Sequence, residues 1–217
     1  MLQQELRRDY FFELAGMPQS GKSAVREIVA HLLKRNGFFI EEYIGGSRGS
    51  ALYNAPIADL NLSLALKTAG FVLETVRTKK AVNRIFLLDR GLIDRCIFTD
   101  TLLRHHLIDA VSAQTINNLL TLPKLLDNID GVYVLVTSPE VALEREYRNK
   151  LIRKEGEVMN PGFLSTMRSV AEESYNDMRN LIRNRNLVLI DTGQDDEHLQ
   201  QIAESIIRNI MHVITTY

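Results

Sequence analysis

An eight-residue segment near the start of the sequence has the residue types and spacing of a phosphate-binding loop. Residues 16–23 read Gly-Met-Pro-Gln-Ser-Gly-Lys-Ser and match G-x-x-x-x-G-K-[ST] at every fixed position. The two glycines allow consecutive backbone amides to turn inward around phosphate oxygens. We expect Lys22 to reach the β- and γ-phosphates of a nucleotide and Ser23 to bind Mg²⁺ through its hydroxyl. The residues expected to contact the nucleotide here are Gly16, Met17, Pro18, Gln19, Ser20, Gly21, Lys22, Ser23 and Ala24.

The segments on either side of this loop have the pattern that the motif requires. The aromatic, apolar run Tyr10–Leu14 predicts a buried strand before it. After Ser23, apolar residues recur at helical spacing as far as Asn36-Gly37. That helix would point its free N-terminal amides at the anion. The alternative, a glycine turn with a chance lysine, explains neither flank.

A second polar pair, Asp89 and Arg90, directly follows the apolar run Ile85–Leu88. In a parallel α/β sheet, the carboxyl ends of the strands open onto the ligand crevice. Asp89 could there hold Mg²⁺ directly or through water. Arg90 could clamp an acceptor phosphate or neutralise charge during its transfer. The alternative is a salt bridge between neighbours at a strand end.

Basic residues gather at the end of a charged helical segment, Pro139–Leu151. Arg145 and Arg148 are three residues apart and share a helix face, and Arg153 follows them. We expect Arg145 and Arg148 to stabilise charge on a transferred phosphoryl group and Arg153 to contact the substrate. The alternative is a solvated face whose charge is balanced by acidic neighbours. These neighbours are Glu144, Glu146, Glu155 and Glu157.

The rest of the chain alternates short apolar runs with longer amphipathic segments. Further strands are expected at Val132–Val136 and Leu187–Ile190. Helices are expected at Pro56–Val76, Leu92–His105, Ser112–Leu126 with a bend or an interruption at Pro123, Pro139–Leu151, Phe163–Asn184 and His198–Met211. The alternation predicts an α/β fold of the P-loop NTPase type, with three layers and a five-stranded parallel sheet flanked by helices. We expect one domain over residues 1–217, with a helical lid inserted at about 145–162.

The composition excludes several classes of protein. Hydrophobic residues make up 45% and charged residues 24% of the 217 residues, as in a globular protein. The 26 basic and 27 acidic side chains nearly cancel, so no general electrostatic binding of nucleic acid is expected. The one cysteine, Cys96, can form no intramolecular disulfide. No charge-free apolar run approaches the roughly 20 residues that span a bilayer, so we expect a cytoplasmic protein without membrane contact.

Two kinds of P-loop protein are disfavoured, a GTPase by the motifs that this sequence lacks and a motor ATPase by the length of the chain. A GTPase needs Asn/Thr-Lys-x-Asp after a later strand, but Val136–Glu140 contains neither the lysine nor the aspartate. The switch pattern Asp-x-x-Gly is also absent at Asp89, because Gly91 comes one place early. A motor ATPase usually exceeds this length.

Four segments together resemble the P-loop nucleoside and nucleoside-monophosphate kinases, and the likeness is closest to thymidylate kinases and deoxynucleoside kinases. They are Gly16–Ser23, Leu87–Gly91, Ser138–Arg145 and Asp191–Gly193. The resemblance implies an arginine-bearing lid after the fourth strand and an adenine site near Thr192 and Gly193. The chain departs from thymidylate kinases at Pro18-Gln19, where these usually have another glycine. It also has Gly91 where they have Tyr, Ser or His, and Asp89 where deoxynucleoside kinases have Glu.

The resemblance also implies a base-like glutamate near the end of the second strand. That strand begins at Phe38–Ile40 and is expected to end at Glu41 and Glu42, with Arg48 in the following turn. A glutamate there could take a proton from a hydroxyl acceptor, whereas a phosphate acceptor is already ionised and needs no base. Adjacent strand residues face opposite ways, so either glutamate could face the site. A solvated strand end explains the pair equally well.

We therefore expect a kinase that uses ATP and Mg²⁺ and phosphorylates a nucleoside, a nucleotide or a related small metabolite. The acceptor would lie near Glu41, Glu42, Arg48, Arg90 and Arg153. Two alternatives stay open: a kinase of a non-nucleotide small molecule, and a nucleotide-binding regulator with little turnover. Apolar residues of the long helix Pro56–Val76 fit either internal packing or the contact of a homodimer. These residues are Leu60, Leu64, Phe71 and Leu73.

Overall fold

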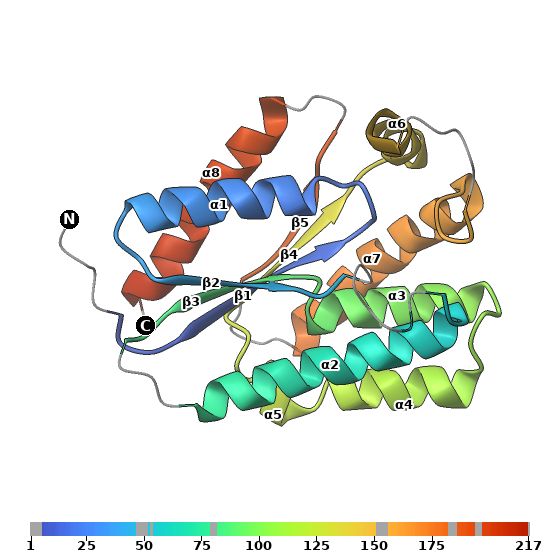
Figure 1. The fold of residues 1–217 in the computed structure, drawn as a ribbon, viewed down its shortest axis with the longest axis horizontal. Helices are drawn as coiled ribbons and strands as arrows, with labels where there is room; N and C mark the ends of the chain where they lie inside the picture. Colours follow the sequence, from blue (N-terminus) through green and yellow to red (C-terminus); the bar gives the residue numbers. More distant parts are fainter. Residues whose placement is uncertain are drawn as a thin grey trace.

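Five parallel strands form the central sheet of the computed structural model, in the order β2-β3-β1-β4-β5 (Figure 1). Their bounds are Tyr10–Gly16 for β1, Ile40–Ile44 for β2, Ile85–Asp89 for β3, Gly131–Val136 for β4 and Asn186–Asp191 for β5. The structure describes residues 6–46, 52, 54–78, 82–150, 156–181, 186–193 and 197–216. This arrangement confirms the predicted three-layer α/β fold of the P-loop NTPase type.

Helices cover both faces of the sheet. On one face lie α1 (Lys22–Arg35) and α8 (Glu197–Thr216), which pack against each other (Figure 1). The other face carries α2, α3, α4, α5 and α7, with bounds Ile57–Arg77, Leu92–Arg104, Ala110–Leu120, Pro123–Leu126 and Pro161–Leu181. The remaining helix, α6 (Pro139–Lys150), follows β4 and contacts α7.

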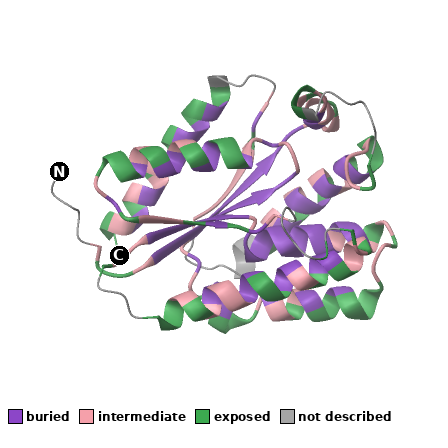
Figure 2. Ribbon diagram, viewed as in Figure 1, coloured by how far each residue is buried: buried purple, intermediate pink, exposed green. Residues whose placement is uncertain are grey.

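The central strand β1 is buried along its whole length and serves both cores, because successive strand residues face opposite sides (Figure 2). Phe12 and Leu14 pack among the side chains of α1 and α8. Phe11 and Ala15 face the helices of the other layer. Glu13 lies between these two in sequence and is fully buried as well. A carboxylate therefore occupies an otherwise apolar face of the sheet.

The second strand does not end at Glu41 and Glu42 as predicted, because β2 continues through both to Ile44. The helical segment expected over Ser112–Leu126 is interrupted at Pro123, as predicted. Pro123 begins the second of two helices, where its missing N–H costs nothing. On α2, Leu60 and Leu64 are buried in the monomer, which favours the packing interpretation for them. No helix among the described residues is long and apolar enough to cross a membrane.

The parallel strands bring their carboxyl ends to one edge of the sheet. Leu14 pairs with Asp89 on β3, and Gly16 pairs with Leu135 on β4. The chain moves from β1 outward to β2, returns to β3 beside β1, and then crosses to the other side for β4. Ligand crevices of open α/β sheets lie at such a reversal of strand order. The phosphate-binding motif and Asp89 thus meet where the fold favours a ligand.

We predict opposite effects of alanine at two glycines. Gly16 has φ +115°, and a Cβ there would lie 2.1 Å from the backbone oxygen of Leu135, so Gly16→Ala should lower the free energy of unfolding by about 2 kcal/mol or more. Gly70 lies within α2, and a Cβ there meets nothing within 4 Å. Gly70→Ala should therefore raise the free energy of unfolding by roughly 0.5 to 1 kcal/mol. Urea denaturation measures both, and equal midpoints for wild type and Gly16→Ala would contradict the close approach.

Candidate active site

The phosphate-binding motif forms a tight turn between β1 and α1. Gly16, Gln19 and Gly21 all have positive φ angles, of 115°, 56° and 84°. Met17 N–H donates to the backbone oxygen of Leu135 at 3.0 Å, which fixes the start of the turn on β4. The backbone at Gly16 approaches β4 too closely for any side chain. This geometry is the one that a loop of inward-facing amides requires.

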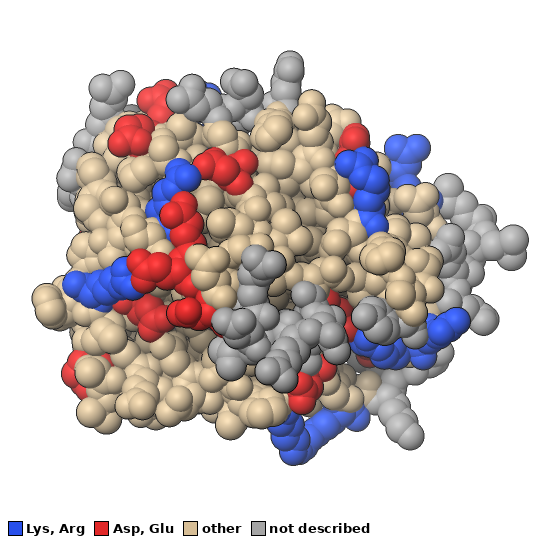
Figure 3. All heavy atoms as spheres, turned by 180° about the vertical axis from the view of Figure 1, so that it is seen from behind, with Lys and Arg blue, Asp and Glu red and all other residues tan. Residues whose placement is uncertain are grey.

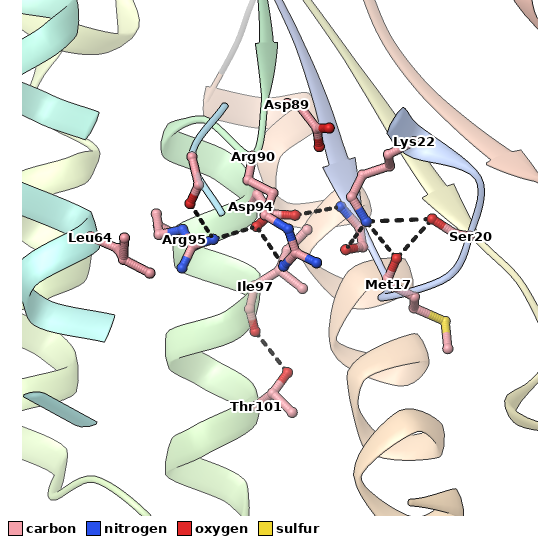
Figure 4. Close-up of polar contacts among 12 residues, drawn as sticks. Met17, Ser20, Lys22, Leu64, Asp89, Arg90, Asp94, Arg95, Ile97 and Thr101 are labelled. Atoms are coloured by element: carbon pink, nitrogen blue, oxygen red, sulfur yellow. Dashed lines mark hydrogen bonds and ion pairs between the residues drawn. The ribbon is translucent and has the colours of Figure 1, made fainter. Parts of the chain in front are cut away.

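The side chain of Lys22 is folded over this turn and is nearly fully buried, with 4% exposed. Its Nζ donates to the backbone oxygens of Gly16, at 2.8 Å, and of Met17 (Figure 4). Burial, with a smaller contribution from the positive charge of Arg90, lowers the pKa of Lys22 to about 7. A buried ammonium of this kind gains strongly from an anion placed beside it.

Ser23 and Asp89 provide adjacent oxygen atoms at the carboxyl edge. Ser23 Oγ donates to Asp89 Oδ2 at 2.7 Å, so the first turn of α1 is joined to the end of β3. Hydroxyl and carboxylate oxygens are ligands that suit Mg²⁺, which needs only one or two protein ligands when a nucleotide supplies phosphates. The donor set therefore fits Mg²⁺. Among the described residues, no group of three or more His, Cys, Asp or Glu could hold a metal ion by itself, without phosphate ligands from a nucleotide.

Asp94 links the phosphate-binding turn to two arginines, and the sequence analysis did not assign it a role. Its carboxylate is fully buried, and Oδ1 accepts a hydrogen bond from Gly16 N–H at 3.0 Å. Oδ2 lies 3.2 Å from an Nη atom of Arg95 and 3.7 Å from one of Arg90 (Figure 4). Arg90 itself adopts φ +69°, a strained conformation for a residue with a side chain. The spacing Asp89-Arg90-Gly-x-x-Asp was the available signal for Asp94.

Glu13 is a second buried carboxylate that the sequence did not reveal. It accepts hydrogen bonds from the N–H groups of Ile93, at 3.2 Å, and Asp94, at 2.7 Å, and so caps the start of α3. Burial raises the pKa of Glu13 to about 7, although these hydrogen bonds oppose the rise. A Cβ on Gly91 would lie 2.5 Å from this carboxylate. The departure from the kinase pattern at Gly91 thus makes room for Glu13.

Arg145 joins three segments that are distant in sequence. Its guanidinium donates to the backbone oxygen of Gln19 at 3.2 Å, to Thr192 Oγ1 at 3.3 Å and to the backbone oxygen of Gly193 at 3.2 Å. The loop after β5, which the resemblance places near adenine, is therefore fixed beside the phosphate-binding turn. Thr192 is fully buried, and its N–H donates to Val136 at 2.9 Å.

The other predicted arginines differ in where the structure places them. Arg148 is exposed and pairs with Glu144 one turn before it, at 3.1 Å, which supports the alternative of a solvated helix face for that arginine. Arg48 and Arg153 lie outside the described residues. Arg90 is at the carboxyl edge as predicted, with its side chain 25% exposed.

The placement of Glu41 and Glu42 also needs correction. Glu41 forms an ion pair with Arg84, which precedes β3 at the opposite, amino end of the sheet. Glu42 lies 2.8 Å from Lys34 and 3.3 Å from Arg26, both on α1. The strand continues two residues beyond these glutamates, so neither lies at the carboxyl edge.

Three solved structures of deoxyadenosine kinase from M. mycoides resemble this chain. The one with the products dCMP and a flexible dCDP bound has a TM-score of 0.67 and 16% sequence identity, covering 93% of this chain and 99% of that chain. The structure with bound dCTP has a TM-score of 0.64 and 15% sequence identity, covering 92% of this chain and 99% of that chain. The structure with bound dATP has a TM-score of 0.63 and 16% sequence identity, covering 91% of this chain and 99% of that chain. No protein-family model and no curated protein matches the sequence. The likeness establishes the fold, which is the α/β fold of the P-loop NTPase type.

We predict that Glu13 makes stability depend on pH. The folded protein keeps the Glu13 proton up to about pH 7, whereas the unfolded chain loses it near 4.5, so the free energy of unfolding falls as pH rises between these values. Glu13→Gln does not titrate, and its amide keeps one of the two oxygens that accept from Ile93 and Asp94. Its free energy of unfolding relative to wild type should rise by roughly 1 to 3 kcal/mol from pH 4.5 to 8.

Glu204 on α8 offers a matched control, because its carboxylate is exposed. Glu204→Gln should leave the pH profile of wild type unchanged. Denaturant titrations at several pH values measure all three proteins, and parallel profiles for wild type and Glu13→Gln would refute the buried titration.

Proposed function

We propose that this protein is a phosphotransferase that uses ATP and Mg²⁺ to phosphorylate a nucleoside, a nucleotide or a related small metabolite. The observation that carries the proposal is the convergence of buried Lys22, the turn over residues 16–21 and the Ser23–Asp89 pair at one edge of the sheet. A passive glycine turn requires neither a buried cation nor a carboxylate beside the hydroxyl. The neighbouring structures that bind dATP, dCTP and dCMP support a nucleotide substrate.

The proposed roles follow from the contacts of each side chain. Residues 16–24 bind the phosphates of ATP, and the Lys22 ammonium moves its hydrogen bonds from Gly16 and Met17 to phosphate oxygens. Thr192 and Gly193, which Arg145 holds beside the turn, border the adenine. Ser23 and Asp89 would hold Mg²⁺, which neutralises phosphate charge when bound. Arg90, at the end of β3, orients the acceptor and stabilises charge during transfer.

The positions of Glu41 and Glu42 bear on which group accepts the phosphate. Glu41 pairs with Arg84 and Glu42 with Lys34, so these glutamates no longer favour a hydroxyl acceptor. A phosphate acceptor needs no base, and Arg90 suits its charge. We therefore propose to test nucleoside monophosphates, including the thymidylate that the sequence resemblance suggests, beside nucleosides. ADP release with MgATP and a panel of nucleosides, nucleoside monophosphates and unrelated metabolites decides among these, and no stimulation by any of them would refute the kinase.

The proposal also covers the partners of the enzyme, its location in the cell and its oligomeric state. On the face seen in Figure 3, acidic and basic side chains lie next to one another, as expected of a protein with no general affinity for nucleic acid. A single buried cysteine, Cys96, fits a cytoplasmic protein. A homodimer stays a prediction, for which Leu62 and Leu66 on α2 offer exposed apolar surface.

We predict that Lys22→Ala abolishes turnover, because it removes the cation from the phosphate site. The expected loss in kcat is at least about a hundredfold, the usual effect of deleting one preorganised donor. Lys34→Ala is the matched control, since Lys34 lies on the same helix but is exposed and pairs with Glu42. Initial rates of ADP release and circular dichroism measure activity and folding. Wild-type turnover in Lys22→Ala would refute the assignment of the phosphate site.

We predict different outcomes for the two arginines of α6. Arg148→Ala should lower kcat more than it weakens ATP binding if this side chain acts on charge that develops during transfer. It should change stability by about 1 kcal/mol at most, because the Arg148–Glu144 pair is exposed. Arg145→Ala should also weaken ATP binding, since it releases Gln19, Thr192 and Gly193.

Arg104→Ala provides a control for removing an exposed arginine that forms an ion pair, here with Glu173 on α7. The kcat, the nucleotide Kd and the melting temperature of the three variants separate the two roles. Full turnover in Arg148→Ala would leave it as a surface residue.

A further inference from the structure

Gln19 belongs to the pair Pro18-Gln19 that stands where thymidylate kinases usually have another glycine, and its side chain makes contacts that no glycine could make. Its Nε2 donates to the carboxylate of Glu146, and its Oε1 accepts from Asn149 Nδ2 at 3.2 Å. Its backbone oxygen accepts from Arg145 at 3.2 Å. One residue of the turn therefore binds three side chains of α6 at once.

These three partners form one polar face of α6. Residues 145, 146 and 149 lie within about one helical turn of each other, so their side chains converge on the same neighbour. Glu146 is 7% exposed, and a buried carboxylate is costly unless hydrogen-bonded. The Gln19 amide offers it a donor, and a charged acceptor makes that hydrogen bond stronger than a neutral one.

The backbone of Gln19 shows that the arrangement has a cost. Its φ of 56° lies in the left-handed region, which residues with a side chain adopt only under strain. A glycine would relieve that strain but would lose both contacts of the amide. The side-chain bonds to α6 offset the strain that the glutamine introduces.

We propose that Gln19 is a positioning residue that fastens α6 to the phosphate-binding turn and so holds the arginine-bearing helix beside the reacting phosphates. The proposal rests on the proposed kinase function, because it assigns Gln19 a role in turnover. Gln19 contacts Glu146 and Asn149 of α6 through its side chain, whereas the proposed phosphate site would use only its backbone. Loss of the side chain should therefore disturb the placement of Arg145 and Arg148 more than the binding of ATP.

The first experiment compares Gln19→Ala with Gln200→Ala. Gln200 on α8 also donates through Nε2 to a glutamate, Glu204, at 3.2 Å, but on an exposed helix surface. Hydrogen exchange without nucleotide should be faster in residues 139–150 of Gln19→Ala and unchanged in Gln200→Ala. In steady-state assays, Gln19→Ala should lose about tenfold or more in kcat with less than about threefold change in KM for ATP, as expected for misplaced groups.

Two further variants remove the same contacts from the α6 side and leave the turn intact. Glu146→Ala and Asn149→Ala should each speed exchange in α6 and lower kcat. The double variant Gln19→Ala/Glu146→Ala should lose little more in kcat than the worse single variant, because Gln19→Ala already removes the hydrogen bond to Glu146. These variants keep the test decisive if Gln19→Ala does not fold.

Unchanged exchange of α6 in Gln19→Ala, additive losses in the double variant, or a rise in KM without loss of kcat would each overturn the positioning role. A wild-type protein with no turnover on any acceptor would instead refute the proposed kinase function. In that case the exchange measurement alone decides whether Gln19 fastens α6.

Discussion

The buried carboxylate of Asp94 is the constraint on which the arrangement of this site depends. It accepts a hydrogen bond from the N–H of Gly16 at the end of β1 and lies between Arg90 and Arg95. Asp94 therefore fixes the phosphate-binding turn relative to α3. A fully buried charge is tolerable only when it is paired and hydrogen-bonded, and Asp94 satisfies both conditions. Removing it would leave Arg95 with an unpaired charge in the interior, where Arg95 is 2% exposed.

Around Asp94, the carboxyl edge of the sheet carries more buried charge than a stable core requires. Burial moves the pKa of Glu13 up and that of Lys22 down, each to about 7, so both groups are held near the point where they change protonation. Such shifts are typical of sites built for ligands rather than for stability. A phosphate beside Lys22 would favour the charged form of its side chain.

The departures from the kinase patterns have local explanations in this fold. Gly91 is small because the carboxylate of Glu13 fills the space where a side chain would lie. Gln19 is large because α6 presents a glutamate and an asparagine to it. A residue that breaks a familiar motif can thus report a compensating contact elsewhere in the same chain.

The sequence by itself determined the order of strands and helices, the phosphate-binding turn and the position of Asp89 and Arg90 at a strand end, because these depend on local periodicity and on glycines that permit positive φ. It could not decide which side chains reach the edge of the sheet. Glu41 and Glu42 were expected there, but β2 extends two residues further and directs them to Arg84 and Lys34. The roles of Glu13 and Asp94 likewise depend on the packing of α3 against β1. Hydrogen bonds between residues some 80 positions apart leave no periodic signal, so only the tertiary structure decided them.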